Sequence, residues 1–131
     1  MTKSELSQYY YLQREIERHN DRIAELMAKA GYQSPSMSGI PGSGAVSDKV
    51  SRYASEIADI MSERRRLIDR SWKELAKIQR YILGISDSLT RQIFDLRYAE
   101  CKTWQQIANA VGGGNTADNV RMIHNNYLIR H

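Results

Sequence analysis

Apolar residues in the middle of the chain recur in alternating steps of four and three residues, and this repeat limits the fold more than any other feature. It continues through more than four heptads and includes two polar positions: Val50, Ala54, Ile57, Met61, Arg64, Ile68, Ser71, Leu75, Ile78 and Ile82. Such spacing is typical of a helix that packs along another helix, as in a coiled coil. We expect a long helix that is capped by Ser47 or Asp48 and ends at Gly84.

A second amphipathic helix is expected before this one, from Glu5 to Ala30, with Gly31 as its C-cap. Its inward positions are Tyr9, Leu12, Ile16, His19, Ile23, Leu26 and Ala30. Residues 31–47 contain both prolines and indicate a flexible linker. Residues 1–85 are therefore predicted to form an antiparallel, coiled-coil-like helical hairpin. We expect its long seam to make the chain a homo-oligomer; the alternative is that the hairpin packs only on the rest of its own chain.

Three shorter helices are expected in residues 86–131, opened by Ser86 or Asp87. Their inward residues are Ile93, Leu96 and Tyr98, then Trp104, Ile107, Ala108 and Val111, then Val120, Ile123, Tyr127 and Leu128. The small Ala108 permits a close helix crossing, and Gly112 supplies a positive-φ turn after the second helix. The sequence thus predicts an all-α chain in which residues 86–131 form a three-helix helix-turn-helix module. In that motif the third helix is presented to the DNA major groove.

The same stretch carries motifs of a known family. They are Leu96-Arg97-Tyr98, Thr103-Trp104-Gln105-Gln106-Ile107-Ala108, Gly112, and Val120 followed by His124 and Leu128. Over these residues the chain resembles region 4 of bacterial sigma factors. With the preceding hairpin, the whole chain resembles the small phage regulators of the RinA/ArpU type. It departs from the usual pattern in its longer, glycine-rich turn at residues 112–115.

This resemblance implies a sequence-specific DNA-binding transcriptional regulator of phage or prophage origin. It further implies an activator of late genes, such as those for packaging and morphogenesis. Such a protein binds double-stranded DNA and contacts host RNA polymerase in the cytoplasm of the bacterial host cell.

Two other classes of protein stay open. An interaction protein would bind the polymerase or another protein without DNA, and the near balance of five basic and four acidic residues in 86–131 favours it. A small terminase subunit, which serves DNA packaging, also combines a helix-turn-helix with oligomerising helices. That family usually has the two parts in the opposite order along the chain.

The predicted third helix, from about Thr116 to Leu128, offers side chains that can contact bases. Opposite its inward face lie Asp118, Arg121, Met122 and Asn125, with Thr116 and Ala117 at the tip. An arginine can bond guanine O6 and N7, an asparagine can bond adenine, and an aspartate can accept from cytosine N4. Alanine and methionine can contact the thymine methyl group.

Contacts to the DNA backbone are predicted at two further places. Thr103 is expected to cap the second module helix with Gln106, and Thr103 or Gln105 can then contact a phosphate. On the long helix, five basic residues share a face away from the apolar seam: Arg66, Arg70, Lys73, Lys77 and Arg80. Residues 47–85 hold nine basic and six acidic side chains, so most of the net charge of +4 lies there. This face follows the DNA backbone, binds an acidic partner, or is simply solvated.

Other features of the sequence point away from catalysis and from membranes. The single Cys101 excludes an internal disulfide and fits a reducing cytoplasm. No apolar run approaches the roughly 18 residues of a membrane span, and the N-terminus lacks the apolar core of a signal peptide. His19, His124 and His131 show no zinc-ligand spacing with Cys101, and no phosphate-binding loop is present. We expect no enzyme activity, no metal and no cofactor.

Overall fold

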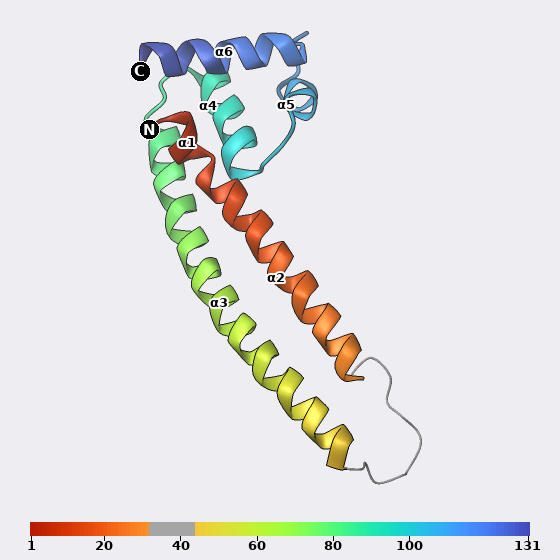
Figure 1. Cartoon of the computed structure of the whole chain (residues 1–131). Helices are drawn as coiled ribbons and strands as arrows, with labels where there is room; N and C mark the ends of the chain where they lie inside the picture. Colours follow the sequence, from red (N-terminus) through yellow and green to blue (C-terminus); the bar gives the residue numbers. More distant parts are fainter. Residues whose placement is uncertain (32–43) are drawn as a thin grey trace. The chain divides into compact units, whose positions relative to one another are not determined.

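The computed structural model describes residues 1–31 and 44–131, and the regular structure of these residues is entirely helical (Figure 1). The elements are α1 (Lys3–Leu6), α2 (Gln8–Ala30), α3 (Gly44–Leu83), α4 (Ser88–Phe94), the π-helix η1 (Asp95–Ala99), α5 (Trp104–Val111) and α6 (Ala117–Arg130). The predicted all-α class is confirmed for this part of the chain. None of these helices combines the length and the apolar character that crossing a membrane requires.

Local capping signals account for the ends of the first two helices. Thr2 caps α1 in a capping box, in which its hydroxyl accepts from the Glu5 amide at 3.1 Å and the Glu5 carboxylate accepts from the Thr2 amide at 3.0 Å. The helix expected from Glu5 thus begins at Lys3, and it is interrupted at Ser7. Its predicted end is confirmed, because Gly31 follows α2 with a φ of +85°.

The long helix α3 begins earlier than the sequence predicted. It starts at Gly44, so Ser47 and Asp48 lie inside it and the predicted cap is wrong. No proline follows Pro41, so no residue of the sequence after it blocks a helix that begins at Gly44. The end of the helix at Leu83 agrees with the prediction. Most of the predicted linker, residues 32–43, lies outside the described residues.

Packing divides the chain into two compact units, and each is considered by itself. One consists of residues 13–69, and the other combines residues 1–12 with residues 70–131. The sequence suggested a division between residues 85 and 86, where the linear pattern of helices changes. One compact unit instead combines residues from both ends of the chain. The observed division therefore does not coincide with the predicted one.

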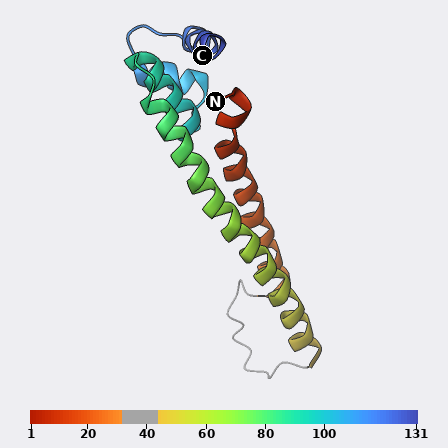
Figure 2. The same cartoon turned by 90° about the vertical axis from the view of Figure 1, so that its left-hand side faces the viewer.

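In the unit of residues 13–69, parts of α2 and α3 run side by side in opposite directions (Figures 1 and 2). Ile23 and Leu26 of α2 bury themselves against Ile57 of α3, and partly buried neighbours complete the cluster: Met27, Tyr53 and Ile60. The inward positions predicted for α2 at Ile23 and Leu26 are thus confirmed. Burial of such side chains supplies the main attraction between two helices in water.

The buried face of α3 differs from the predicted seam by part of a turn. Ala54 and Met61 were expected to face inward but are exposed, while Tyr53, Ile60 and Leu67 are partly or fully buried. The reason is that some positions of α3 belong to both the predicted and the observed face, and apolar residues lie on both sides of them. A repeat of four and three can therefore be drawn along either flank, and only the position of α2 decides between them.

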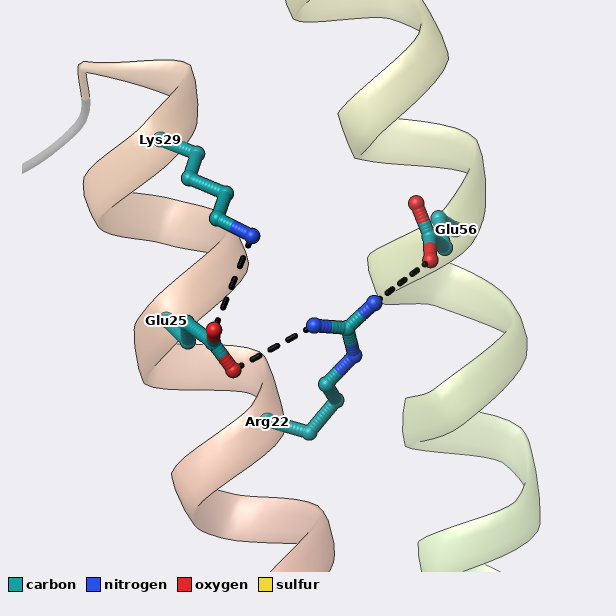
Figure 3. A network of polar contacts seen from close by, with 4 residues as sticks. All are labelled: Arg22, Glu25, Lys29 and Glu56. Carbon is teal, nitrogen blue, oxygen red and sulfur yellow. Dashed lines mark hydrogen bonds and ion pairs between the residues drawn. The ribbon is translucent and has the colours of Figure 1, made fainter.

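Ion pairs join the same two helices at their surface (Figure 3). Arg22 of α2 lies 3.3 Å from Glu56 of α3 and 3.2 Å from Glu25 of its own helix, and Lys29 lies 3.5 Å from Glu25. The hydrogen bond from Arg22 is the largest cause that lowers the pKa of Glu25, followed by the charge of Lys29. These side chains are 44–55% exposed, so solvent screens the pairs and they contribute little stability.

The other unit has a core built from both ends of the chain. Its buried residues are Leu6, Ile78, Ile82, Ile85, Phe94 and Tyr98, and Met1, Tyr9, Tyr81, Tyr127 and Leu128 pack against them. The ring of Phe94 lies 5.6 Å from that of Tyr98 and 5.2 Å from that of Tyr127. The first residues of the chain and its last helix therefore share one core with the end of α3, α4 and η1.

A second cluster in this unit joins the three C-terminal α-helices. Ile93 of α4, Ile107 and Ala108 of α5 and Val120 of α6 are buried in it. Ala108 is 2% exposed, as expected for a small residue at a helix crossing. Asp87 caps α4, because its carboxylate accepts from the Thr90 amide at 2.9 Å. The predicted start of the C-terminal helices is thereby confirmed.

Candidate nucleic-acid interface

The connection between α5 and α6 is an ordered, glycine-rich turn. Gly112, Gly113 and Gly114 have φ values of +66°, +66° and +76°, a left-handed region that favours glycine. The Asn115 side chain closes the turn by donating to the Gly112 carbonyl at 2.8 Å. Thr116 then caps α6, because its hydroxyl accepts from the Asn119 amide at 3.1 Å. The predicted positive φ at Gly112 is confirmed, and the direction of α6 is set by specific contacts.

One side of α6 is fixed in the core and the other faces solvent. Val120 and His124 are fully buried, and Ile123, Tyr127 and Leu128 are partly buried. The four predicted base-contacting residues Asp118, Arg121, Met122 and Asn125 are all exposed, and together they form what we call the outer face of α6. At the tip of the helix, Thr116 is exposed and Ala117 is partly buried. The structure therefore brings the six predicted residues of this helix together on one surface.

Two residues of the outer face pair with each other. Arg121 lies 3.3 Å from Asp118, and their side chains are 54% and 85% exposed. An ion pair this open to solvent is weak, so the Arg121 guanidinium can exchange it for another acceptor. Met122 is 57% exposed beside them and offers an apolar contact. Asp118 thus restrains Arg121 in the free protein and does not immobilise it.

A hydrogen-bonded chain connects the core to the outer face through His124. The Tyr98 hydroxyl is hydrogen-bonded to Nε2 of His124, and Nδ1 of His124 lies 2.8 Å from Oδ1 of Asn125. Desolvation is the largest cause that lowers the pKa of His124, so the ring is neutral near pH 7. Since Oδ1 of Asn125 accepts, Nδ1 carries the ring proton and Nε2 accepts from Tyr98. The buried ring therefore orients the Asn125 amide and leaves its NH₂ group to an outside partner.

Aromatic rings enclose His124 on several sides. Its ring centroid lies 4.9 Å from those of Phe94 and Trp104 and 5.5 Å from that of Tyr98. Burial also raises the pKa of Tyr98 to about 12, so this hydroxyl stays protonated and able to donate. Sequence patterns alone missed this arrangement, because Tyr98 and His124 lie 26 residues apart.

The first turn of α5 presents the predicted backbone-contacting residues. Thr103 and Gln105 are exposed. The predicted capping box is confirmed: the Thr103 hydroxyl accepts from the Gln106 amide at 3.2 Å, and the Gln106 side chain accepts from the Thr103 amide at 2.9 Å. These bonds leave the amides of Trp104 and Gln105 as the two first-turn donors without a partner inside the helix. An anion at this helix end would meet both of them.

The predicted basic stripe of α3 is exposed at all five positions: Arg66, Arg70, Lys73, Lys77 and Arg80. Arg66 pairs with Glu63 at 3.4 Å and Lys77 pairs with Glu74 at 3.3 Å, so part of this charge is compensated locally. Arg66 belongs to the unit of residues 13–69 and the other four belong to the unit that contains α6. The stripe is thus carried by a different helix from the outer face.

The sequence-based prediction also missed one apolar residue on this surface. Ile129 is 82% exposed and lies one helical turn after Asn125, on the same side of α6. The prediction ended this helix at Leu128, but it continues to Arg130. The spacing of Met122, Asn125 and Ile129 was available as a signal, since residues three and four apart share a helix face.

Comparison with known proteins finds no match to this chain among family models, curated proteins or solved structures.

Proposed function

We propose that this chain is a sequence-specific DNA-binding transcriptional regulator. In this proposal α5, the glycine-rich turn and α6 act as a helix-turn-helix, and the outer face of α6 enters the major groove. The observation that carries the proposal is the two-sided construction of α6. One side is anchored by Val120 and His124, while the other presents hydrogen-bonding side chains to solvent, one of them oriented from the core.

The chemistry of the outer face suits the edges of base pairs. Arg121 can donate twice to guanine, and Asn125 can donate to N7 and accept from N6 of adenine. Oδ1 of Asn125 has a second lone pair beside the one that His124 uses, so both adenine contacts are compatible with the hydrogen bond from the core. Met122 and Ala117 can contact thymine methyl groups, and Asp118 can accept from cytosine N4. Thr103, Gln105 and Thr116 supply phosphate contacts that set the register.

The sigma-region-4-like motifs extend the proposal to a phage or prophage regulator of the RinA/ArpU type. Its action would be to recruit host RNA polymerase to late genes in the bacterial cytoplasm, without covalent chemistry. Residues 86–131 are nearly neutral, so phosphate neutralisation by them alone is weak. We therefore include in the proposal a homo-oligomer, which doubles the DNA contacts, and backbone contacts from Arg70, Lys73, Lys77 and Arg80.

A binding selection against random duplex DNA tests the proposal. The purified full-length chain is expected to enrich a defined site, and fluorescence anisotropy then measures its affinity at two salt concentrations. Arg121→Ala and Asn125→Ala should abolish the enrichment. Arg14→Ala is the matched control for the first variant, because Arg14 forms the same kind of exposed pair with Glu17 at 3.1 Å. Asn126→Ala is the control for the second. Failure of the wild-type chain to enrich any sequence overturns the proposal.

A second candidate is an interaction protein that binds another protein through the same helix. The observation that favours it is the pair of exposed apolar side chains on α6, Met122 at 57% and Ile129 at 82%. Methionine is enriched at protein interfaces, and the buried core of an interface is more apolar than its rim. A pull-down with host RNA polymerase by the wild-type chain and by Ile129→Ser distinguishes the two. Loss of polymerase binding in Ile129→Ser, together with no DNA enrichment by the wild type, would favour this candidate.

A further inference from the structure

A pocket lies beside the first turn of α5 and is built from the N-terminal residues of the chain and from residues 97–103. It has a volume of about 360 Å³. Residues of α1 and α2 line one side, and η1 with the segment that leads from it to α5 lines the other. The lining residues that matter here are Lys3, Tyr10, Tyr11, Arg97, Lys102 and Thr103. All of them belong to the same compact unit. We call this cavity the α5 pocket.

The charge of the α5 pocket is of one sign. Lys3, Arg97 and Lys102 contribute three cations, and none of its lining residues is an aspartate or a glutamate. Arg97 is held in place, because its Nη1 donates to the Lys102 carbonyl at 2.9 Å and its guanidinium lies 4.3 Å from the centre of the Trp104 ring. A cavity with fixed positive charge and no carboxylate favours an anionic ligand.

Uncharged donors reinforce this preference. Thr103 at the pocket wall caps α5, whose first-turn amides at Trp104 and Gln105 have no hydrogen-bond partner inside the helix. On the opposite wall, Tyr10 and Tyr11 are 41% and 62% exposed, and their rings meet edge to face at 5.3 Å. Tyrosine hydroxyls and helix N-termini are both common donors to phosphate oxygens in protein–DNA complexes.

We propose that the α5 pocket binds a phosphate of the DNA backbone, so that the first eleven residues of the chain are part of its DNA-binding surface. This inference rests on the proposed function. A duplex backbone is favoured as the source of the phosphate because Thr103, the N-cap of α5 and a predicted phosphate-contacting residue, lines the pocket. Lys3 also brings a positive charge from outside residues 86–131, whose own charges nearly cancel.

The test is the salt dependence of DNA binding by the full-length chain. The double variant Lys3→Ala with Lys102→Ala should bind more weakly, and the slope of log affinity against log salt should become shallower by about 0.9, as expected for the loss of one phosphate contact. Its preferred base sequence should not change. Tyr11→Phe should weaken binding at an unaltered slope. The control is Arg14→Ala with Lys29→Ala, which removes two exposed cations of residues 13–69 and should leave slope and affinity unchanged.

The outcomes separate this inference from the proposed function. An unchanged slope in the Lys3 and Lys102 variant, with sequence selection intact, overturns the pocket assignment alone. Wild-type binding that is salt-dependent but blind to sequence overturns the proposed function, and the slope comparison still decides about the pocket. No DNA binding at any salt concentration overturns both. Circular dichroism and thermal unfolding of each variant show that a change in slope does not come from loss of the fold.

Discussion

The two compact units of this chain are both helical, yet they are held together by different kinds of contact. In residues 13–69, two helices share a stripe of apolar side chains, and the polar contacts between Arg22, Glu25 and Glu56 stay at the surface. The unit that contains α6 has capped short helices, an aromatic core and a buried polar pair, Tyr98 and His124. A simple repeat is enough to join two helices, whereas presenting chosen side chains on α6 requires individually positioned partners.

Replacement of Phe94 should lower the free energy of unfolding more than any other change that distinguishes the two units. Phe94 is fully buried and contacts the rings of Tyr98, His124 and Tyr127, so Phe94→Ala should lower the free energy of unfolding by about 3–5 kcal/mol. Ile57→Ala in the other unit should cost only about 2 kcal/mol, because a two-helix layer can close around the gap. Urea unfolding followed by circular dichroism measures both. Equal costs would remove the distinction between the two cores.

Removal of the buried Tyr98 hydroxyl should have the next largest effect on stability. Tyr98→Phe leaves Nε2 of His124 without its donor inside the core, and an unsatisfied buried group costs about 1–3 kcal/mol. The control is Tyr53→Phe, which removes a tyrosine hydroxyl from the partly buried cluster of the other unit and should cost less. The same urea titrations provide the comparison. A Tyr98→Phe protein as stable as the wild type would mean that the hydrogen bond to His124 contributes nothing.

The turn before α6 should respond to a smaller change. Gly112→Ala places a Cβ atom on a residue with a φ of +66° and a ψ of −148°, a backbone region essentially restricted to glycine, and such strain costs about 1–3 kcal/mol. No atom lies within 4 Å of the added Cβ, so backbone strain is the whole effect. Thermal unfolding should show a lower Tm. A variant with an unchanged or higher Tm would show that the turn does not need its left-handed geometry.

The buried His124 should make stability depend on pH in the mildly acidic range. Burial lowers its pKa below the ordinary value of 6.5, so the unfolded chain takes up a proton there that the folded chain does not. The contribution of His124 to the free energy of unfolding is fully present above pH 6.5. It is lost as the pH falls below that value, by at most about 1.4 kcal/mol per pH unit. Asp87, whose pKa is lowered chiefly by the Thr90 amide, loses its contribution only below about its ordinary value of 3.8.

Urea midpoints between pH 5 and 8 measure this dependence, and His124→Gln is the control because glutamine does not titrate. The wild-type chain should lose stability on acidification across this range, while the variant should show a flatter profile. Parallel profiles for the two proteins would assign the pH dependence to other groups.

Disruption of the surface network between α2 and α3 should have the smallest effect. Arg22→Ala removes both ion pairs of an arginine that is 44% exposed, and screening by solvent makes such pairs weak. We expect a Tm close to that of the wild type, and a difference that shrinks further at high salt. A large loss of stability would place Arg22 among the contacts that hold this unit together.

Most features that depend on neighbouring residues were predictable from the sequence, and the cap at Ser47 or Asp48 was the exception. The C-cap at Gly31, the N-cap at Asp87 and the capping box at Thr103 need only three or four consecutive residues to form. The exposure of Arg121 and Asn125 followed from helical spacing in the same way. These features are local, so a short window of sequence contains their cause.

Features that need a distant partner were not predictable. Met61 was placed in the seam because either flank of α3 satisfies the repeat, and only α2 decides between them. The hydrogen bond from Tyr98 to His124 and the approach of Lys3 to Lys102 both join residues far apart in the chain. The π-helix Asp95–Ala99 likewise forms the last part of a segment that the sequence presents as an ordinary helix.

The most direct test of the account is whether Asn125 contacts one particular adenine. The selected DNA site is prepared with each adenine replaced in turn by 7-deazaadenine, which lacks the N7 acceptor, and the affinities of wild type and Asn125→Ala are compared. Base recognition by Asn125 predicts one position where the replacement weakens wild-type binding by about 1–3 kcal/mol and leaves binding by Asn125→Ala unaffected. The same loss in both proteins at every position would contradict base recognition by Asn125 on the outer face of α6.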